Sequence, residues 1–174
     1  MKVFSVFGVS KSGKTTTIEL LIRELVSRGC TVGSVKDIHF EQFAIDTPGT
    51  NTHRHKQAGA NPVTARGLYE TDIMFDKRLS VTEILRFYNQ DFVILEGVNE
   101  PGIPAILTAD SAGGPDAQLT PFVFAVSGRA AARIDSYNGI PAIDATADIT
   151  ALADLAERKA LRWPPENTTG GVCR

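Results

Sequence analysis

Gly8-Val-Ser-Lys-Ser-Gly-Lys-Thr15 matches the pattern GxxxxGK(S/T) at each constrained position. Apolar residues dominate positions 3–7 before it, and a helical pattern follows it. The pattern binds phosphate when it lies between a strand and a helix, so this context disfavours the alternative of an ordinary strand-to-helix turn. We interpret residues 8–15 as a phosphate-binding loop.

The residue types of this loop suit a phosphate ligand. Gly8 and Gly13 permit backbone conformations and a close approach of phosphate that a Cβ would obstruct. Successive backbone N–H groups form an anion-binding concavity, and the following helix directs its N-terminal dipole at the same charge. We expect Lys14 to reach the β- and γ-phosphates and to act in catalysis, and Thr15 to supply a hydroxyl to Mg²⁺. The predicted nucleotide-binding residues are Gly8, Val9, Ser10, Lys11, Ser12, Gly13, Lys14, Thr15 and Thr16.

The composition is that of an ordinary globular protein. The chain has 174 residues, of which 43% are hydrophobic and 22% charged, and its net charge of −2 provides no basic field for nucleic acid. No apolar run approaches the ~18 residues needed to span a bilayer, and the residues before Gly8 are too few for a signal peptide. We therefore expect a cytoplasmic protein that binds neither membranes nor nucleic acid.

The length of the chain favours one domain. We expect a single nucleotide-binding domain over 1–163, with a loop-rich insertion at about 98–120 and a flexible tail over 164–174. The two cysteines, Cys30 and Cys173, are far apart and form no CxxC pair. Neither a disulfide framework nor a cysteine zinc site is therefore indicated.

Strand and helix patterns alternate behind the phosphate loop. Apolar residues recur with helical spacing over about 15–28, and a short strand pattern follows at 31–36. Further strands are expected at 43–45, 62–65, 71–75, 91–97, 105–108, 122–126 and 139–143, and further helices near 51–56, 81–88 and 148–161. This alternation predicts an α/β fold of the P-loop NTPase type, with a mainly parallel sheet flanked by helices.

Three acidic residues, Asp37, Asp46 and Glu96, lie at predicted strand ends. A metal-bound triphosphate needs a carboxylate near the Thr15 hydroxyl, directly or through water. Glu96 follows four apolar residues and precedes a glycine, as a Walker-B-like acid does; the alternative is a solvated strand end. Asp46 begins Asp-Thr-Pro-Gly49, which resembles the DxxG element that senses the γ-phosphate; the alternative is a turn. We expect Thr15, Glu96 and Asp46 around the metal, with Asp46 also catalytic.

A polar segment contains the adjacent residues His53, Arg54 and His55. Such a group suits an anionic second ligand, and the alternative is a solvated helix face. The His-x-His spacing indicates no metal site, since neighbours at i and i+2 diverge on a helix. Arg66 and Arg129, each beside a glycine at a predicted strand end, are further candidates for contact with an anion.

Four segments carry a resemblance when they are taken together. They are Gly8-Val-Ser-Lys-Ser-Gly-Lys-Thr-Thr16, Val35-Lys-Asp-Ile-His39, Asp46-Thr-Pro-Gly-Thr-Asn-Thr-His-Arg-His-Lys-Gln-Ala-Gly-Ala60 and Val93-Ile-Leu-Glu-Gly97. In this order they resemble the MobB family of molybdopterin-guanine dinucleotide biosynthesis proteins, over roughly the first hundred residues. The third segment discriminates best, because many nucleotide-binding families share the phosphate loop.

Membership of that family implies a GTP-binding α/β protein, usually a homodimer, with weak Mg²⁺-dependent GTP hydrolysis. It implies assistance to a MobA-type guanylyltransferase, which converts molybdopterin to its guanine dinucleotide. By matching positions, residues 8–16 hold the phosphates, while Asp46 and Glu96 lie around Mg²⁺ or the phosphate terminus. The candidates for contact with the pterin or another anion are His53, Arg54, His55 and Arg66.

The sequence leaves three functions open. The first is a GTP-binding accessory protein, whose guanine preference rests only on the resemblance because neither Asn-Lys-x-Asp nor Thr-Lys-x-Asp occurs. The second is a small-molecule kinase that uses ATP, although residues 98–120 hold no arginine or lysine for a lid. The third is a nucleotide-gated module in which Asp46 orders the residues after it for a protein partner.

Overall fold

The structure, a computed structural model, describes residues 1–41, 43–110 and 118–164. The tail expected over 164–174 lies outside the described residues apart from Pro164, and so does the middle of the insertion expected at 98–120. Within the described part of the chain, no helix has the length and apolar content needed to cross a bilayer.

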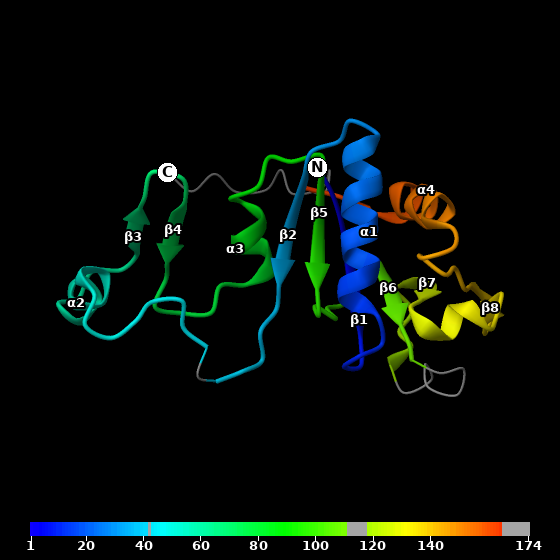
Figure 1. Cartoon of the computed structure of the whole chain (residues 1–174), viewed down its shortest axis with the longest axis horizontal. Coiled ribbons are helices and arrows are strands. Elements are labelled where there is room, and N and C mark those ends of the chain that lie inside the picture. Colours follow the sequence, from blue (N-terminus) through cyan, green and yellow to red (C-terminus); the bar gives the residue numbers. More distant parts are fainter. Residues whose placement is uncertain (42, 111–117, 165–174) are drawn as a thin grey trace. The chain divides into compact units, whose positions relative to one another are not determined.

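The contacts divide the chain into two compact units. The first unit is made of Met1–Asp37 and Tyr88–Arg174, and the second of Ile38–Phe87. The expected single domain over 1–163 stays a prediction. Figure 1 labels most of the elements of both units.

The first unit is built on a mainly parallel sheet. Its strands are β1 Lys2–Gly8, β2 Val32–Lys36, β5 Phe92–Glu96, β6 Ala105–Thr108, β7 Val123–Ser127 and β10 Leu161–Arg162, with a hairpin of β8 Ser136–Tyr137 and β9 Ile140–Pro141. Its helices are α1 Lys14–Ser27, the 3-10 helix η2 Arg129–Ala132 and α4 Ile149–Lys159. The strand order is β2-β5-β1-β6-β7 (Figure 1), and β10 pairs antiparallel with β1. The expected α/β fold is confirmed.

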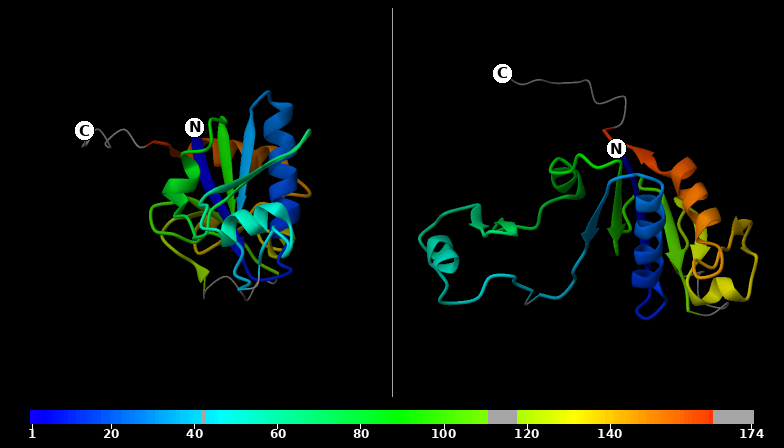
Figure 2. Two further views of the ribbon diagram at one scale, coloured as in Figure 1. Left: turned by 90° about the vertical axis from the view of Figure 1, so that its left-hand side faces the viewer. Right: turned by 45° about the horizontal axis from the view of Figure 1, so that its top comes forward.

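Helices α1 and α4 pack on one face of this sheet and lie side by side (Figure 2). Phe4 and Val6 alternate towards this face from β1, and they share a fully buried cluster with Leu21 of α1 and Leu152 of α4. Burial of each such side chain contributes about 1.5–3 kcal/mol. The helical spacing that predicts α1 is therefore the spacing of its buried face.

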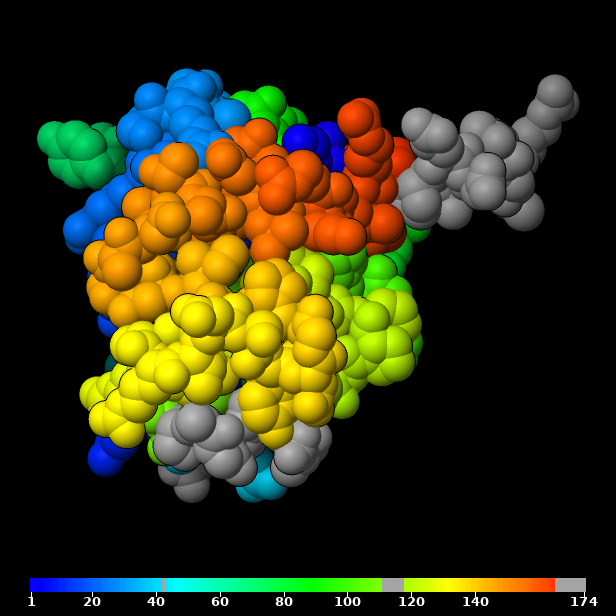
Figure 3. All heavy atoms as spheres, turned by 90° about the vertical axis from the view of Figure 1, so that its right-hand side faces the viewer, coloured from blue at the N-terminus to red at the C-terminus, as the bar shows by residue number. Residues whose placement is uncertain are grey.

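In Figure 3 residues 129–141 (yellow), which follow β7, lie next to α4 (orange). The last helix was expected to reach residue 161, and this boundary is wrong. The backbone of Ala160 turns to an extended conformation, with ψ of 140°, and Leu161 pairs with Val3 of β1. Strand pairing therefore ends the helix two residues early.

The parallel strands bring their carboxyl ends to one edge of the sheet. Val6 of β1 lies opposite Glu96 of β5, and Gly8 opposite Thr108 of β6. On the other side of β5, Lys36 of β2 also lies opposite Glu96. In open α/β sheets this edge is where ligands bind, and here it is the edge from which the phosphate loop starts.

The described residues of the second unit form four short elements. They are α2 Asn51–Gln57, β3 Val63–Arg66, β4 Thr71–Met74 and α3 Val81–Leu85, of which β3 and β4 are antiparallel. The capping box at Ser80 is confirmed, because its hydroxyl accepts the N–H of Glu83 and its N–H donates to the Glu83 carboxylate. The strand predicted at 43–45 is wrong: in the described part of the chain these residues pair with no strand, and Phe43 and Ile45 are 51% and 67% exposed.

Candidate nucleotide-binding site

The phosphate loop joins β1 to α1 through two left-handed positions. Lys11 has φ of 63° and Gly13 has φ of 100°. Such turns direct successive backbone N–H groups towards one point and make an anion-binding concavity. Gly13 is also the N-cap of α1, and no described side chain caps that helix end. The first N–H groups of α1 can therefore donate to an anion.

Neighbouring strands hold the loop in place by close backbone contact. A Cβ on Gly8, where φ is 149°, would lie 2.0 Å from the carbonyl oxygen of Thr108. A Cβ on Gly128, just after β7, would lie 2.2 Å from the carbonyl oxygen of Ser12. The loop thus packs against the ends of β6 and β7. This packing requires a glycine at position 8.

Two buried hydroxyls connect the loop to β6. The Ser12 hydroxyl donates to the carbonyl of Val9 at 2.8 Å and lies 2.7 Å from the Thr108 hydroxyl, which donates to the carbonyl of Phe7 at 3.1 Å. Ser12 and Thr108 are both fully buried. The Ser12 side chain, predicted to bind nucleotide, is therefore engaged within the protein. Thr108 was missed, and its only signal is its position at the end of a predicted strand.

Lys14 folds back over the loop. Its Nζ donates to the carbonyls of Gly8 at 2.7 Å and Val9 at 2.6 Å. Burial lowers the pKa of Lys14, an effect that the Glu96 carboxylate opposes and the Lys36 ammonium reinforces. These three charged groups therefore interact at the carboxyl edge of the sheet.

Thr15 and Glu96, both predicted to hold the metal, are brought together. The Thr15 hydroxyl donates to Oε1 of Glu96 at 3.4 Å, and Lys36 Nζ donates to the same oxygen at 2.5 Å. Among the described residues, no cluster of three or more His, Cys, Asp or Glu could hold a metal ion. The Thr15 hydroxyl and the Glu96 carboxylate are oxygen groups of the kind that Mg²⁺ binds together with phosphate and water.

Asp46 belongs to the second unit, where it organises the start of α2. Its Oδ1 accepts from the Thr50 hydroxyl at 2.8 Å, the Thr52 hydroxyl at 2.9 Å and the Thr47 N–H at 3.0 Å. Thr50 in turn caps α2 by accepting the N–H of His53. The hydrogen bond from Thr50 is the main cause of a lowered pKa of Asp46. Its role at the γ-phosphate or the metal stays a prediction.

The predicted anion contacts also belong to the second unit. His53, Arg54 and His55 lie on α2, where His53 is half-buried and the other two are exposed. Arg54 and His55 are in the last turn of this helix, a place where positive charge also stabilises the helix dipole. Arg66 is exposed at the end of β3. Contact of these residues with a pterin or another anion stays a prediction.

Comparison with known proteins identifies relatives by sequence. A family model described as molybdopterin guanine dinucleotide synthesis protein B matches residues 3–126. A curated relative of Methanocaldococcus jannaschii, named for an adapter role in molybdopterin-guanine dinucleotide biosynthesis, is 32% identical over 123 residues, which are 67% of this chain and 50% of that protein. A Haemophilus influenzae adapter protein of the same biosynthesis is 32% identical over 110 residues, 60% of this chain and 61% of that protein. The chain thus spans between half and two thirds of the length of these relatives.

Solved structures show the same architecture. The crystal structure of Bacillus subtilis MobB superposes with a TM-score of 0.74 at 22% identity, over 92% of this chain and 99% of that one. A MobB homologue of Bacillus stearothermophilus gives a TM-score of 0.67 at 21% identity, over 91% and 98% of the two chains. At such identities the likeness concerns the fold. Because the family model covers more than half of the sequence, the chain belongs to the MobB family.

Proposed function

We propose that the protein is a GTP-binding adapter of molybdopterin guanine dinucleotide biosynthesis, with weak Mg²⁺-dependent GTP hydrolysis. One observation carries the nucleotide site: Lys14, Thr15 and Glu96 converge beside a loop whose backbone forms an anion-binding concavity. The names of the curated relatives support the adapter role.

Each residue of the site has a separate task in this proposal. The loop N–H groups hold the phosphates, and Lys14 exchanges the carbonyls of Gly8 and Val9 for phosphate oxygens. Thr15 and Glu96 would hold Mg²⁺, which would supply neutralisation of the phosphate charge. The chain's own contribution is thus to orient and neutralise the triphosphate. Weak turnover is consistent with a protein whose task is to bind and present a nucleotide.

The partners are proposed by analogy with the family. They are a MobA-type guanylyltransferase and molybdopterin. The proposed location of the protein is the cytoplasm. Anion contact is assigned to the basic side chains of the second unit, which are His53, Arg54, His55 and Arg66.

A homodimer is proposed because the second unit exposes large apolar side chains. Phe40 is 66% exposed, Ile45 67%, Leu68 95% and Tyr69 100%. Exposed apolar groups in such number are typical of interaction surfaces. Gel filtration of the wild type and of a Leu68→Glu variant tests this, because the substitution is expected to shift the equilibrium towards monomer.

Isothermal titration of the full chain with GTP and with ATP, each in Mg²⁺, tests the nucleotide assignment. We expect tighter binding of GTP, and a loss of binding in Lys14→Ala. Glu96→Gln is expected to weaken Mg²⁺-dependent binding while leaving binding in EDTA unchanged, because the substitution removes the carboxylate and retains the side-chain shape. Equal or tighter binding of ATP would favour the kinase or the nucleotide-gated module. A wild-type protein that binds neither nucleotide would overturn the proposal.

A further inference from the structure

Besides Lys14, a lysine of β2 lies at this site: Lys36 forms an ion pair with Glu96, the carboxylate that is proposed to bind the metal. Lys36 and Glu96 lie opposite each other at the ends of β2 and β5. Lys36 Nζ donates to Glu96 Oε1 at 2.5 Å, and the Thr15 hydroxyl donates to that same oxygen at 3.4 Å. The position proposed for Mg²⁺ is therefore flanked by an ammonium group from a strand outside the phosphate loop.

We propose that Lys36 selects triphosphate over diphosphate: its ammonium leaves Glu96 when metal-bound nucleotide engages that carboxylate, and it then binds the γ-phosphate. The inference rests on the proposed function and adds to it a residue outside the phosphate-loop pattern. A diphosphate offers no γ-phosphate. The displaced ammonium then gains no new partner, and the exchange is favourable only with a triphosphate.

Exposure makes this exchange feasible. The Lys36 side chain is 59% exposed, whereas that of Glu96 is 13% exposed. An ion pair with one exposed partner is weak and easily exchanged, and the flexible stem of lysine lets its ammonium move without movement of the strand. Glu96 is the less exposed partner, so a neighbouring cation stabilises its charged form more than it would that of an exposed carboxylate. Lys36 can therefore move while Glu96 stays in place.

Shared contacts place Lys36 beside the position proposed for the metal and the phosphates. Lys36 Nζ and the Thr15 hydroxyl contact the same oxygen of Glu96. Thr15 directly follows Lys14 in α1. The ammonium groups of Lys36 and Lys14 therefore both belong to the carboxyl edge of the sheet. Their mutual repulsion disfavours a site that contains both charges and no anion, and a bound γ-phosphate relieves it. A phosphate held by Lys14 is thus also attracted to Lys36.

The test is isothermal titration of full-length wild type and Lys36→Met with Mg²⁺ and either GDP or the β,γ-imido analogue of GTP, which resists hydrolysis. We expect the variant to bind the analogue about tenfold more weakly, as loss of one hydrogen bond to a charged group implies. Its affinity for GDP is expected to be unchanged or higher, because no ammonium then competes for Glu96. Lys36→Arg is expected to restore selectivity, and Lys159→Met, at an exposed position of α4, controls for the loss of one positive charge.

The results distinguish a failure of the role proposed for Lys36 from a failure of the proposed nucleotide-binding function. An unchanged ratio of analogue to GDP affinity in Lys36→Met, or an equal loss for both ligands, would overturn the role of Lys36 while leaving the nucleotide site intact. Absence of binding in the wild type would overturn the proposed function and this inference with it. A Mg²⁺ titration of the GDP complex gives a second readout, in which Lys36→Met is expected to need less Mg²⁺ than wild type. Circular dichroism of each variant confirms that it is folded.

Discussion

The hydroxyl of Ser12 lies 2.7 Å from the hydroxyl of Thr108, although 96 positions separate the two residues in the sequence. Both are fully buried, and Thr108 also donates to the carbonyl of Phe7. The conformation of the phosphate loop therefore depends on a strand that contributes nothing to its sequence pattern. This dependence can be measured in two ways.

The first prediction concerns Thr108→Val, which removes the hydroxyl and keeps the side-chain shape. It leaves the buried Phe7 carbonyl and the Ser12 hydroxyl with one partner fewer, and should lower the free energy of unfolding by about 1–3 kcal/mol. Nucleotide affinity should fall too, because the loop is less preorganised. Urea unfolding and calorimetry measure the two effects. Thr108→Ser, which retains the hydroxyl, is the matched control, and equal stability of the two variants would contradict the prediction.

The second prediction compares alanine at two glycines. Gly29 has φ of 83° with no neighbour within 4 Å of a Cβ, so Gly29→Ala should cost only the ~1–2 kcal/mol of left-handed strain. Gly8→Ala should lower the free energy of unfolding by about 1–3 kcal/mol more than Gly29→Ala does, because the added Cβ would meet the backbone oxygen of Thr108. Thermal unfolding of both variants gives the difference. Similar losses of stability in Gly8→Ala and Gly29→Ala would mean that β6 can move away from the loop.

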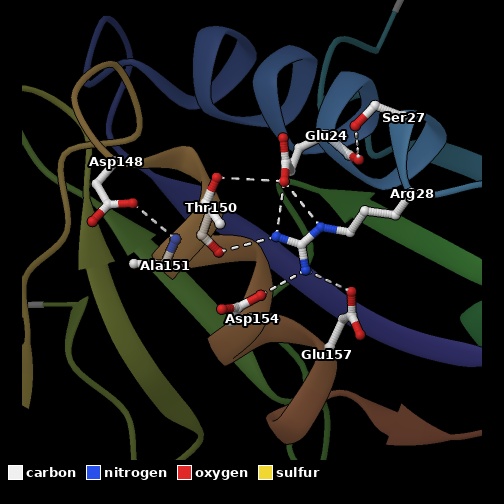
Figure 4. A network of polar contacts seen from close by, with 8 residues as sticks. All are labelled: Glu24, Ser27, Arg28, Asp148, Thr150, Ala151, Asp154 and Glu157. Carbon is white, nitrogen blue, oxygen red and sulfur yellow. Dashed lines mark hydrogen bonds and ion pairs between the residues drawn. The ribbon is translucent and has the colours of Figure 1, made fainter.

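Arg28 connects the two helices that cover the sheet (Figure 4). Its guanidinium donates to Glu24 on its own helix at 2.8 Å, and to Asp154 at 2.6 Å and Glu157 at 2.9 Å on α4. A further bond reaches the carbonyl of Thr150 at 3.2 Å. The planar fork of arginine suits several acceptors at once, so Arg28 adds polar contacts between α1 and α4 to their shared apolar cluster.

The third prediction follows from this network. Arg28→Met retains the aliphatic stem, loses the charged fork, and should lower the free energy of unfolding by about 1–2 kcal/mol, since the partners are partly exposed and screened. The loss should shrink at high salt. Urea unfolding at two salt concentrations measures it, with Arg23→Met at an exposed position of the same helix as the control. An equal loss in both variants would assign the effect to helix propensity.

Local patterns in the sequence predict much of this structure. The phosphate loop, its strand and its helix follow from glycine spacing and apolar periodicity, and the meeting of Thr15 with Glu96 follows from the rule that parallel strands end at one edge. The order of the strands, by contrast, cannot be predicted from local patterns. That β6 lies beside β1 and β2 beside β5 depends on packing between distant segments. The contacts of Thr108 with Ser12 and of Lys36 with Glu96 could therefore not be predicted before the sheet was known.

Two further cases show where local reasoning reaches its limit. Residues 43–45 are apolar and predict a strand, but in the described chain they have no neighbouring strand, and a strand requires a partner to satisfy its backbone. Asp46 was interpreted through its likeness to DxxG. The short-range chemistry of aspartate and threonine at helix starts would also have predicted its bonds to Thr50 and Thr52.

The fourth prediction separates the two interpretations of Asp46. Asp46→Asn weakens the acceptor of two threonine hydroxyls, so amide hydrogen exchange should become faster at the start of α2. The folded pKa of Asp46 is lowered, so its stabilising effect is present above its ordinary pKa and is lost as pH falls through the lower folded value. The protection factors of these amides, which correct for the intrinsic pH dependence of exchange, should therefore fall in that acidic range in the wild type and not in the variant.

The same variant tests the predicted role at the nucleotide. If Asp46 contacts the γ-phosphate or the metal, Asp46→Asn must lower Mg²⁺-dependent affinity for GTP relative to Glu70→Gln, which removes an exposed charge from the same unit. Faster exchange in α2 with unchanged affinity and unchanged GTP hydrolysis would limit Asp46 to the capping of that helix. Loss of affinity with unchanged exchange would show that its local bonds are replaceable, and that its carboxylate acts on the ligand.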